Sequence, residues 1–216
     1  ETGAYHGHGS VAVPQEALIT WALMMEGGFQ VNLNGERFSN EHSGYSEQAV
    51  SVLAQPQGLA WNIYDRRLHD LGMTFEDYRN ACGAGAARQA DMIEDLARQC
   101  GLPGGALAAT LAEVGRLAGG EGRDRFGRDF TGKPHLQPPF FAVKVTGALF
   151  HTQGGLLIDT QARVLRENGA PIPNLFAGGG AACGLSGSTV DGYLSGNGLL
   201  SAIVLGRIAG QSAART

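Results

Sequence analysis

The glycine-rich pattern in the last third of the chain most constrains the fold. Residues 172–184 read IPNLFAGGGAACG, an apolar segment that runs into three consecutive glycines. Residues 192–198 read GYLSGNG and lead into a segment of small and apolar residues. An apolar strand, a bare glycine turn and a helix in this order allow the backbone to approach a large flat ligand, with the helix N-terminus aimed at it. A strand-to-helix turn without a cofactor is the alternative interpretation of the same pattern.

Charge and cysteine content exclude several functional classes. The 216 residues carry a formal net charge of −4 with no basic block, which argues against nucleic acid or an anionic membrane surface as a partner. The three cysteines show no Cys-x-x-Cys or Cys/His ligand spacing, so we expect neither a disulfide framework nor a metal site. A reducing, cytoplasmic compartment fits best. No apolar run reaches the roughly 18 residues of a membrane span.

Periodicity and turn residues predict a series of short helices and strands. Asn34-Gly35 between two apolar segments predicts a hairpin turn. The apolar spacing of residues 86–100, followed by Gly101, predicts a helix and its end. We also expect helices over residues 15–26, 46–55, 74–82, 105–118 and 197–214, and strands over residues 59–64, 138–146, 156–158 and 175–177.

Four segments, in the same order along the chain, resemble one flavoprotein family. They are VNLNGERFSNE at 31–41, the segment 101–128 with its Phe-Gly-Arg, HTQGG at 151–155, and the glycine-rich strand and helix start after residue 172. The family is that of the FAD-dependent fumarate reductases and succinate dehydrogenases, and the chain also resembles tricarballylate dehydrogenase and the 3-ketosteroid Δ1-dehydrogenases. The resemblance covers nearly the whole chain and implies FAD as the cofactor.

The resemblance implies an α/β fold in two parts. Residues 1–8 would end a first flavin-domain segment, residues 9–148 would form an α+β cap (substrate) domain of helices and a small antiparallel sheet, and residues 149–216 would return to the Rossmann-like FAD domain. The family's Gly-x-Gly-x-x-Gly fingerprint does not occur in these 216 residues. We therefore expect a fragment that lacks the ADP-binding half, which belongs to the same polypeptide or to another chain.

Histidines at the two crossovers between these parts are candidate catalytic residues. His151 precedes Gly154-Gly155, where the backbone bends close to a ligand. The resemblance implies that His151 donates a hydrogen bond to a substrate carboxylate or carbonyl, which histidine can do in either charge state. By position, His6 or His8 matches a second family histidine near the substrate, and the sequence does not distinguish the two. A strand-end histidine bonded to backbone is the alternative for His151.

Two tyrosines occupy positions where the fumarate reductases carry arginine. Tyr45 lies four residues after Glu41, where the family arginine donates a proton to the substrate. Tyr193 lies four residues before Asn197, where a second arginine binds carboxylate. The two replacements argue against fumarate as the substrate, although tyrosine can still donate or accept a proton. The structural alternatives are packing on the hairpin for Tyr45 and a lid over the flavin edge for Tyr193.

The glycine loop and the start of the last helix would line the flavin. Free N–H groups and the positive helix end would stabilise the negative charge of reduced flavin. Of the arginines near the family segments, Arg37 is expected to pair with an acid of the cap, and Arg128 is a candidate to reach the site. The expected cofactor-binding residues are Gln153, Gly154, Gly179, Gly180, Ser195, Gly196, Asn197, Gly198 and Leu199.

The resemblance thus implies an FAD-dependent oxidoreductase that acts on CH–CH groups. Such an enzyme moves a hydride between flavin N5 and a carbon next to a carboxylate or ketone, with a small carboxylate other than fumarate, or an enone, as substrate. Two hypotheses from other classes remain. The chain is a cap with part of a flavin domain that is not catalytic and binds no FAD by itself, or it is a nucleotide-binding module without a redox role. No phosphate-binding Lys or Asp pattern supports the latter.

Overall fold

The chain divides into two compact units. The computed structural model describes residues 5–152, 154–186, 189–190 and 193–215, with the backbone alone at residues 5–8 and 150–152. The larger unit is Gly9–Ala148, and the smaller unit comprises Glu1–His8 and Leu149–Thr216. Both passages of the chain between the units lie within strands, which are β1 (Tyr5–Ala12) and β5 (Phe140–Thr152).

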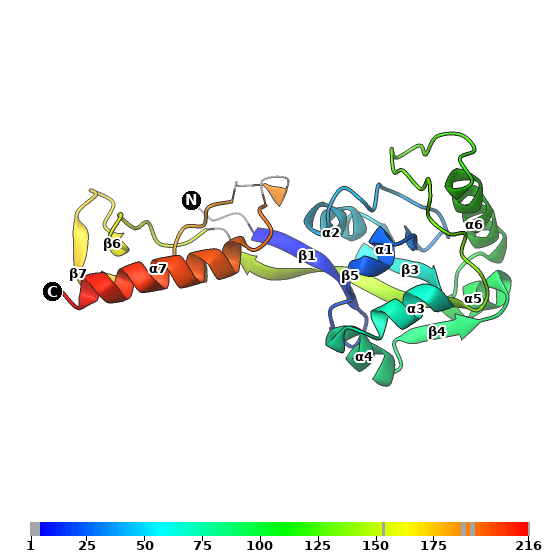
Figure 1. Cartoon of the computed structure of the whole chain (residues 1–216), viewed down its shortest axis with the longest axis horizontal. Helices are drawn as coiled ribbons and strands as arrows, with labels where there is room; N and C mark the ends of the chain where they lie inside the picture. The colour runs from blue at the N-terminus through cyan, green and yellow to red at the C-terminus, as the bar shows by residue number, and fades with distance from the viewer. Residues whose placement is uncertain (1–4, 153, 187–188, 191–192, 216) are drawn as a thin grey trace. The chain divides into compact units, whose positions relative to one another are not determined.

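An antiparallel sheet forms the centre of the larger unit (Figure 1). Its strand order is β1-β5-β3-β2, and β4 also pairs with β5. Ile63 of β3 lies opposite Phe29 of β2 and Ala142 of β5, and all three side chains are fully buried. A slip by one residue would turn these side chains to the other face, so their burial fixes the register. The remaining strands of this sheet are β2 (Phe29–Val31), β3 (Leu59–Asp65) and β4 (Ala87–Ala90).

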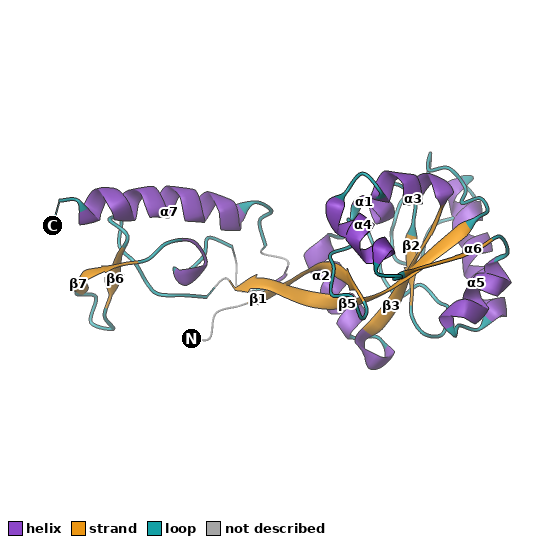
Figure 2. Ribbon diagram, turned by 90° about the horizontal axis from the view of Figure 1, so that it is seen from below, coloured by secondary structure: helices purple, strands orange, loops and turns teal. Residues whose placement is uncertain are grey.

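Helices pack around this sheet (Figures 1 and 2). The helix α5 shows how the sequence forms such an element. Its apolar residues recur at helical spacing on one buried face. Gly101 then adopts the left-handed conformation (φ 69°) and ends the helix. At α3, the carboxylate of Asp65 accepts the Leu68 N–H at 3.1 Å and caps the helix. The helices are α1 (Ala22–Met25), α2 (Tyr45–Leu53), η1 (Pro56–Gly58), α3 (Arg66–Gly72), α4 (Glu76–Gly83), α5 (Ile93–Cys100) and α6 (Gly104–Ala118).

The smaller unit has little core of its own. The strands β6 (Arg163–Leu165) and β7 (Pro171–Phe176) pair with each other, and η2 (Gly179–Ala181) and the long α7 (Asn197–Ala213) follow. Among its described residues, the buried hydrophobic cluster consists of Val164, Ala177 and Ala182. Exposed apolar side chains are instead concentrated here: Leu149, Leu156, Leu157, Leu175, Leu185, Leu194, Leu199, Leu200, Ile203 and Val204.

The structure confirms most of the predicted elements and corrects four of them. The helix predicted over 15–26 is wrong before Ala22, because residues 12–19 turn back on β1, with the Ile19 N–H donating to the Ser10 carbonyl at 3.0 Å. The first part of the helix predicted over 86–100 is the strand β4, which adds to the edge offered by β5. Edge pairing outcompetes the helical spacing there.

The other two corrections concern the smaller unit. Residues 156–158 make isolated bridges and no strand of their own, with Leu156 bridging to Ala182 and Ile158 to Val164. The strand over 175–177 exists as part of β7 but is not buried, since Leu175 is 42% exposed. Within the described ranges, no helix is long and apolar enough to cross a membrane.

Candidate functional site

Tyr45 lies against the strand that carries His8. Tyr45 is the first residue of α2, after Gly44 in a conformation (φ 124°) that favours glycine, and it is half-buried. A side-chain carbon added at Gly9 would lie 3.9 Å from Cβ of Tyr45, so the two backbones meet closely. Within the larger unit, the start of α2 therefore lies close to Gly9, the β1 residue that directly follows His8.

The segment that leads into α2 is held by a buried ionic cluster. The guanidinium of Arg37 binds Glu41 at 2.8 Å and Asp124 at 2.6 Å, and Arg128 binds Glu41 at 3.1 Å. All four side chains are at most 1% exposed. Burial would raise the pKa of Glu41, but hydrogen bonding to Arg37 and the charges of Arg37 and Arg128 lower that pKa below its ordinary value. The prediction that Arg37 pairs with an acid is confirmed.

Arg128 belongs to the same cluster and is committed to structure. Its guanidinium also donates to the carbonyls of Gly28 at 2.8 Å and Met24 at 2.6 Å, and it lies 4.1 Å from the centre of the Phe130 ring. A side chain that is fully buried with these partners offers little to a substrate. The family segment around Phe-Gly-Arg is thus explained by packing.

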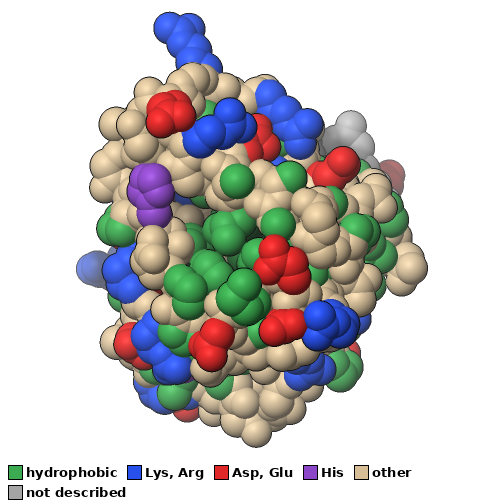
Figure 3. All heavy atoms as spheres, turned by 90° about the vertical axis from the view of Figure 1, so that its right-hand side faces the viewer, with side chains coloured by type: hydrophobic (Ala, Val, Ile, Leu, Met, Phe, Trp, Pro, Cys, Tyr) green, Lys and Arg blue, Asp and Glu red, His purple; other side chains and the backbone are tan. Residues whose placement is uncertain are grey.

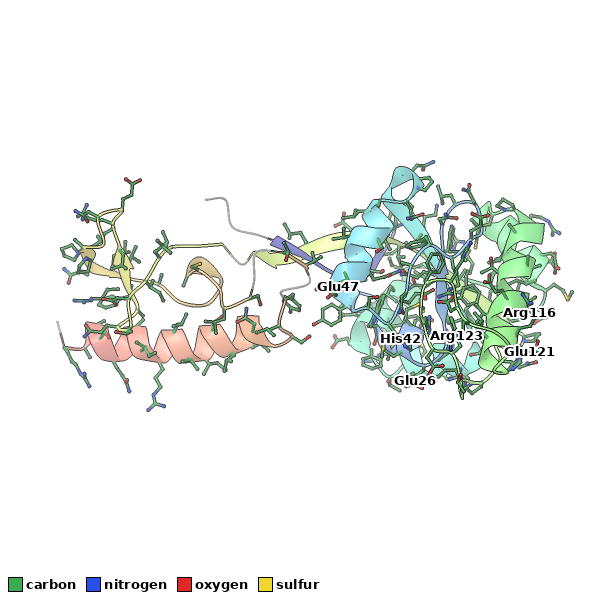
Figure 4. All side chains as sticks on the ribbon, turned by 90° about the horizontal axis from the view of Figure 1, so that it is seen from above. Glu26, His42, Glu47, Arg116, Glu121 and Arg123 are labelled. Carbon is green, nitrogen blue, oxygen red and sulfur yellow. The ribbon has the colours of Figure 1, made fainter. Side chains whose placement is uncertain are left out.

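His42 is a half-buried histidine in the same segment. Its Nε2 lies 3.4 Å from the Met24 carbonyl. Burial, and then the charge of Arg128, lower the pKa of His42 below 6.5, which favours the neutral ring. Figure 4 marks His42 and Glu47 on the segment that enters and begins α2. His42 is not among the residues predicted from the sequence, although its place directly after the Asn-Glu of the family segment is a signal that points to it.

The glycine loop of the smaller unit packs on α7. A side-chain carbon at Gly178 would lie 3.0 Å from Leu205, and one at Gly179 would lie 3.2 Å from Ala202, so close helix packing accounts for both glycines. Gly180 differs, because it is exposed and a side-chain carbon there would meet nothing within 4 Å. Gly180 is the loop position that the protein's own packing does not explain.

The start of α7 presents an open helix N-terminus. Gly196 caps it in the left-handed conformation (φ 80°), and Ser195, Gly196, Gly198 and Leu199 are exposed. Buried Asn197 anchors this turn by donating from Nδ2 to Ser186 Oγ at 3.0 Å. Tyr193 is half-buried just before the turn. The predicted residues of this segment are therefore contiguous in space as well as in sequence.

The chain that follows His151 is locked to the residues after the glycine loop. Gly155 passes so close to Ala182 that a side-chain carbon would lie 2.5 Å from its backbone. The Leu156 N–H donates to the Ala181 carbonyl at 2.9 Å, and the Cys183 N–H donates to the Leu156 carbonyl at 3.0 Å. The side chains of His8 and His151 are outside the described residues, and so is the whole of Gln153. Gly154 is half-buried.

One cleft of the larger unit lies between the end of α6 and the segment before β5. Its volume is about 360 Å³, its lining includes residues 133–137 with Arg116 and Glu121, and Figure 4 shows the last two at the end of α6. Among the described residues, none of the predicted catalytic side chains lines it. On the face shown in Figure 3, hydrophobic side chains gather in the middle, and basic and acidic side chains alternate around them.

Comparison with known proteins identifies the family. A family model described as FAD binding domain matches residues 4–199. The chain belongs to this FAD-binding family, and FAD is the cofactor that the membership assigns. It is 32% identical to a probable fumarate reductase of Shewanella frigidimarina over 96% of this chain and 34% of the relative. It is 27% identical to a 3-oxosteroid 1-dehydrogenase of Mycobacterium tuberculosis over 77% of this chain and 35% of the relative.

Solved structures agree with this family. The open conformation of a flavocytochrome c3 fumarate reductase superposes with a TM-score of 0.77 at 32% identity, over 98% of this chain and 36% of that chain. The predicted mixed fold of helices and antiparallel sheet next to a flavin-domain segment is confirmed. The chain spans about a third of the length of the curated relatives named above.

The residues at the glycine loop and the start of α7 fit a flavin. Open Gly180 leaves room for a flat ring against the backbone, and Gly196 opens the helix without a side chain in the way. The exposed first turn offers backbone N–H groups and the positive helix end, which suit the electron-rich edge of the ring system. Gly180 and the segment 195–199 are thus the residues that would hold the cofactor.

Proposed function

We propose that this chain is part of an FAD-dependent oxidoreductase that acts on CH–CH groups. It comprises the end of a first flavin-domain segment (residues 1–8), the cap domain (residues 9–148) and the C-terminal segment of the FAD-binding domain (residues 149–216). The observation that carries the proposal is the position of Tyr45 beside Gly9 of β1. The family match gives the cofactor, and the close approach of Tyr45 to Gly9 brings a proton-carrying side chain to the strand of the first crossover. A positioned proton-carrying side chain is one of the groups that hydride transfer coupled to proton transfer needs.

The substrate we propose is a small carboxylate other than fumarate, or an enone. The fumarate reductases of the family bind and protonate their substrate with arginines at the positions of Tyr45 and Tyr193. A phenol cannot form the two-point contact with a carboxylate that an arginine forms. It can hydrogen-bond to a single carbonyl oxygen and exchange a proton with a neighbouring carbon.

FAD, when bound, would supply the hydride-transfer chemistry at N5. His151 donates a hydrogen bond to the substrate oxygen and stabilises the negative charge that develops there. Tyr45 or Tyr193 moves the second proton. Gly154, Ser195 and the segment 196–199 would hold the flavin.

The proposed partner is the ADP-binding half of the flavoprotein, in the same or another chain. The exposed apolar side chains of the smaller unit, several of them on α7, support this proposal. An apolar helix face is normally covered by another part of the protein. We further propose a cytoplasmic location, which the free thiols of Cys82, Cys100 and Cys183 support.

The test is an assay of the complete flavoprotein that contains this chain. With reduced methyl viologen as electron donor, we expect oxidation on addition of a tricarboxylate alkene or a cyclic enone, and little with fumarate. Fast turnover with fumarate, unchanged in Tyr45→Phe and Tyr193→Phe, would contradict both the substrate class and the role of the tyrosines.

A second candidate function is a non-catalytic cap that binds no FAD by itself. The small core of the smaller unit favours it for the isolated 216-residue chain. The pyrophosphate contacts that supply much of the affinity for a dinucleotide are not among these residues. We expect the isolated chain to be colourless after purification and the complete protein to be yellow. Tight stoichiometric FAD on the isolated chain would refute this expectation.

A further inference from the structure

A buried hydrogen-bond chain ties the helix of Tyr45 to the strand of His8. The chain begins at Gln48, which lies one turn after Tyr45 on α2 and is 1% exposed. Its Nε2 donates to Gln30 Oε1 at 2.7 Å, and its Oε1 accepts from Ser39 Oγ at 2.8 Å. The amide of Gln48 is thus held at both ends, on one side by the sheet and on the other by the segment before the helix.

Gln30 carries the connection across the sheet. Its Nε2 donates to Ser10 Oγ at 2.9 Å and to Asn62 Oδ1 at 2.7 Å, so it joins β1, β2 and β3 from a fully buried position. Its backbone N–H donates to Glu41 at 3.0 Å, which links this chain to the ionic cluster. Both donors and the acceptor of the Gln30 amide are therefore engaged.

These contacts form a closed path. Ser10 directly follows Gly9, where an added side-chain carbon would lie 3.9 Å from Cβ of Tyr45. The path from Tyr45 through Gln48 and Gln30 to Ser10 thus returns to Tyr45 through Gly9. Apolar packing under α2 would tolerate small shifts of the helix, whereas hydrogen bonds between buried amides are directional and are costly to leave unmade.

We propose that Gln48 is a positioning residue, which acts through Gln30 to fix Tyr45 against the crossover strand β1. The catalytic consequence rests on the proposed function, but the placement of Tyr45 does not. Gln48 is too deeply buried to meet a substrate, and its one role in the site is to set the position of the helix start. A displacement of about 1 Å at a proton-carrying group is enough to cost on the order of 100-fold in turnover.

The experiment uses the flavin-loaded complete protein with tyrosine labelled at the ring carbon that bears the hydroxyl. The Tyr45 resonance is assigned by its loss in Tyr45→Phe. Gln48→Met keeps the side-chain shape and removes both hydrogen bonds. We expect it to move the Tyr45 resonance and to lower turnover on the order of 100-fold. An unmoved Tyr45 resonance in the folded variant would overturn the proposal.

A matched control and a milder variant separate position from stability. Gln55→Met removes amide hydrogen bonds to Asn32 and Ser51 beyond the other end of α2, and we expect it to leave Tyr45 unmoved. Gln48→Glu keeps the acceptor for Ser39 and, in the protonated form that burial favours, keeps a donor to Gln30, so we expect a smaller shift. If neither Gln48 variant folds, Gln48 is a structural residue and the proposal fails. Full turnover in Tyr45→Phe would sink the proposed role of Tyr45 while the resonance still tests its positioning.

Discussion

Arg37 and Glu41 form a two-point ion pair in the interior of the larger unit, with Nε 3.0 Å from Oε1 and Nη2 2.8 Å from Oε2. The two residues are one family segment, Arg-Phe-Ser-Asn-Glu, folded back on itself. Arg128 and Asp124 complete the cluster from a segment about ninety residues away, as the Arg37–Asp124 separation of 87 shows. The cluster therefore joins the segment before α2 to a segment that lies far from it in the sequence.

Glu41→Leu should destabilise the larger unit strongly. It leaves the guanidinium groups of Arg37 and Arg128 buried with less compensating charge, and breaking a buried pair in this way costs about 3–5 kcal/mol. The measurement is the free energy of unfolding in urea. Arg98→Ala is the control, because its pair with Asp95 is exposed (77% and 48%) and contributes less than about 1 kcal/mol. Equal effects of the two substitutions would show that the cluster is not a structural lock.

The free energy of unfolding should decrease as the pH is lowered, because His69 becomes protonated more readily in the unfolded chain. His69 Nδ1 lies 2.9 Å from the buried Tyr78 hydroxyl, which lies 2.7 Å from the Tyr64 hydroxyl. Burial, and then the charge of Arg66, lower the pKa of His69 below 6.5, while Asp70 opposes the shift. Because the unfolded chain binds the proton more readily, this share of stability is present above about pH 6.5 and is lost as the pH falls below it.

His69→Gln tests this sign. The variant should show a shallower fall in unfolding free energy between about pH 7 and pH 5 than the parent does. His42, whose pKa is also lowered, should retain its own share in the same window. The lowered pKa of Glu41 acts only at more acid pH, below its ordinary value of 4.5. If His69→Gln left this slope unchanged, the pKa of His69 would be the same in the folded and unfolded states, which would contradict the prediction.

Local secondary structure could be predicted well from the sequence, whereas strand pairing in the sheet could not. The Asn34-Gly35 turn is confirmed, with the Asn32 N–H donating to the Glu36 carbonyl at 2.9 Å. The turn is not followed by a paired strand, because Arg37 leaves the sheet for the ionic cluster. Residues 87–90 have helical spacing but fold as β4, since a free edge of β5 depends on the whole sheet and cannot be read locally.

The candidate site shows the same division. Motif resemblance selected Tyr45, and geometry placed it against Gly9, but no local pattern pointed to Gln48 or Gln30. A buried glutamine in a helix reads as a surface residue until its partners in the sheet are known. The roles of Tyr45, Tyr193, His151 and His8 remain predictions.

The exposed face of α7 should drive self-association of the isolated chain. Leu199 and Ile203 are 75% and 71% exposed and lie one turn apart. Each such side chain contributes about 1.5–3 kcal/mol when buried, so changing both to Gln should weaken association on the order of 100-fold. Sedimentation over a range of concentrations measures this, with Arg166→Gln, an exposed residue of the same unit outside α7, as control. A parent chain that stays monomeric throughout would contradict the expectation.

The last prediction concerns His151 in the complete flavoprotein. A few residues after it, Gly155 and Leu156 are bound to the residues that follow the glycine loop, where we propose that the flavin lies. A donor that meets charge developing in the transition state typically contributes on the order of 100-fold or more to turnover. His151→Ala should therefore lower kcat by about that factor and leave the flavin absorbance spectrum unchanged. Tyr193→Phe should cause a smaller loss with a shifted pH profile if its hydroxyl moves the proton. Near-full turnover in His151→Ala, with flavin bound, would make His151 a structural residue and would remove the central donor from the proposed site.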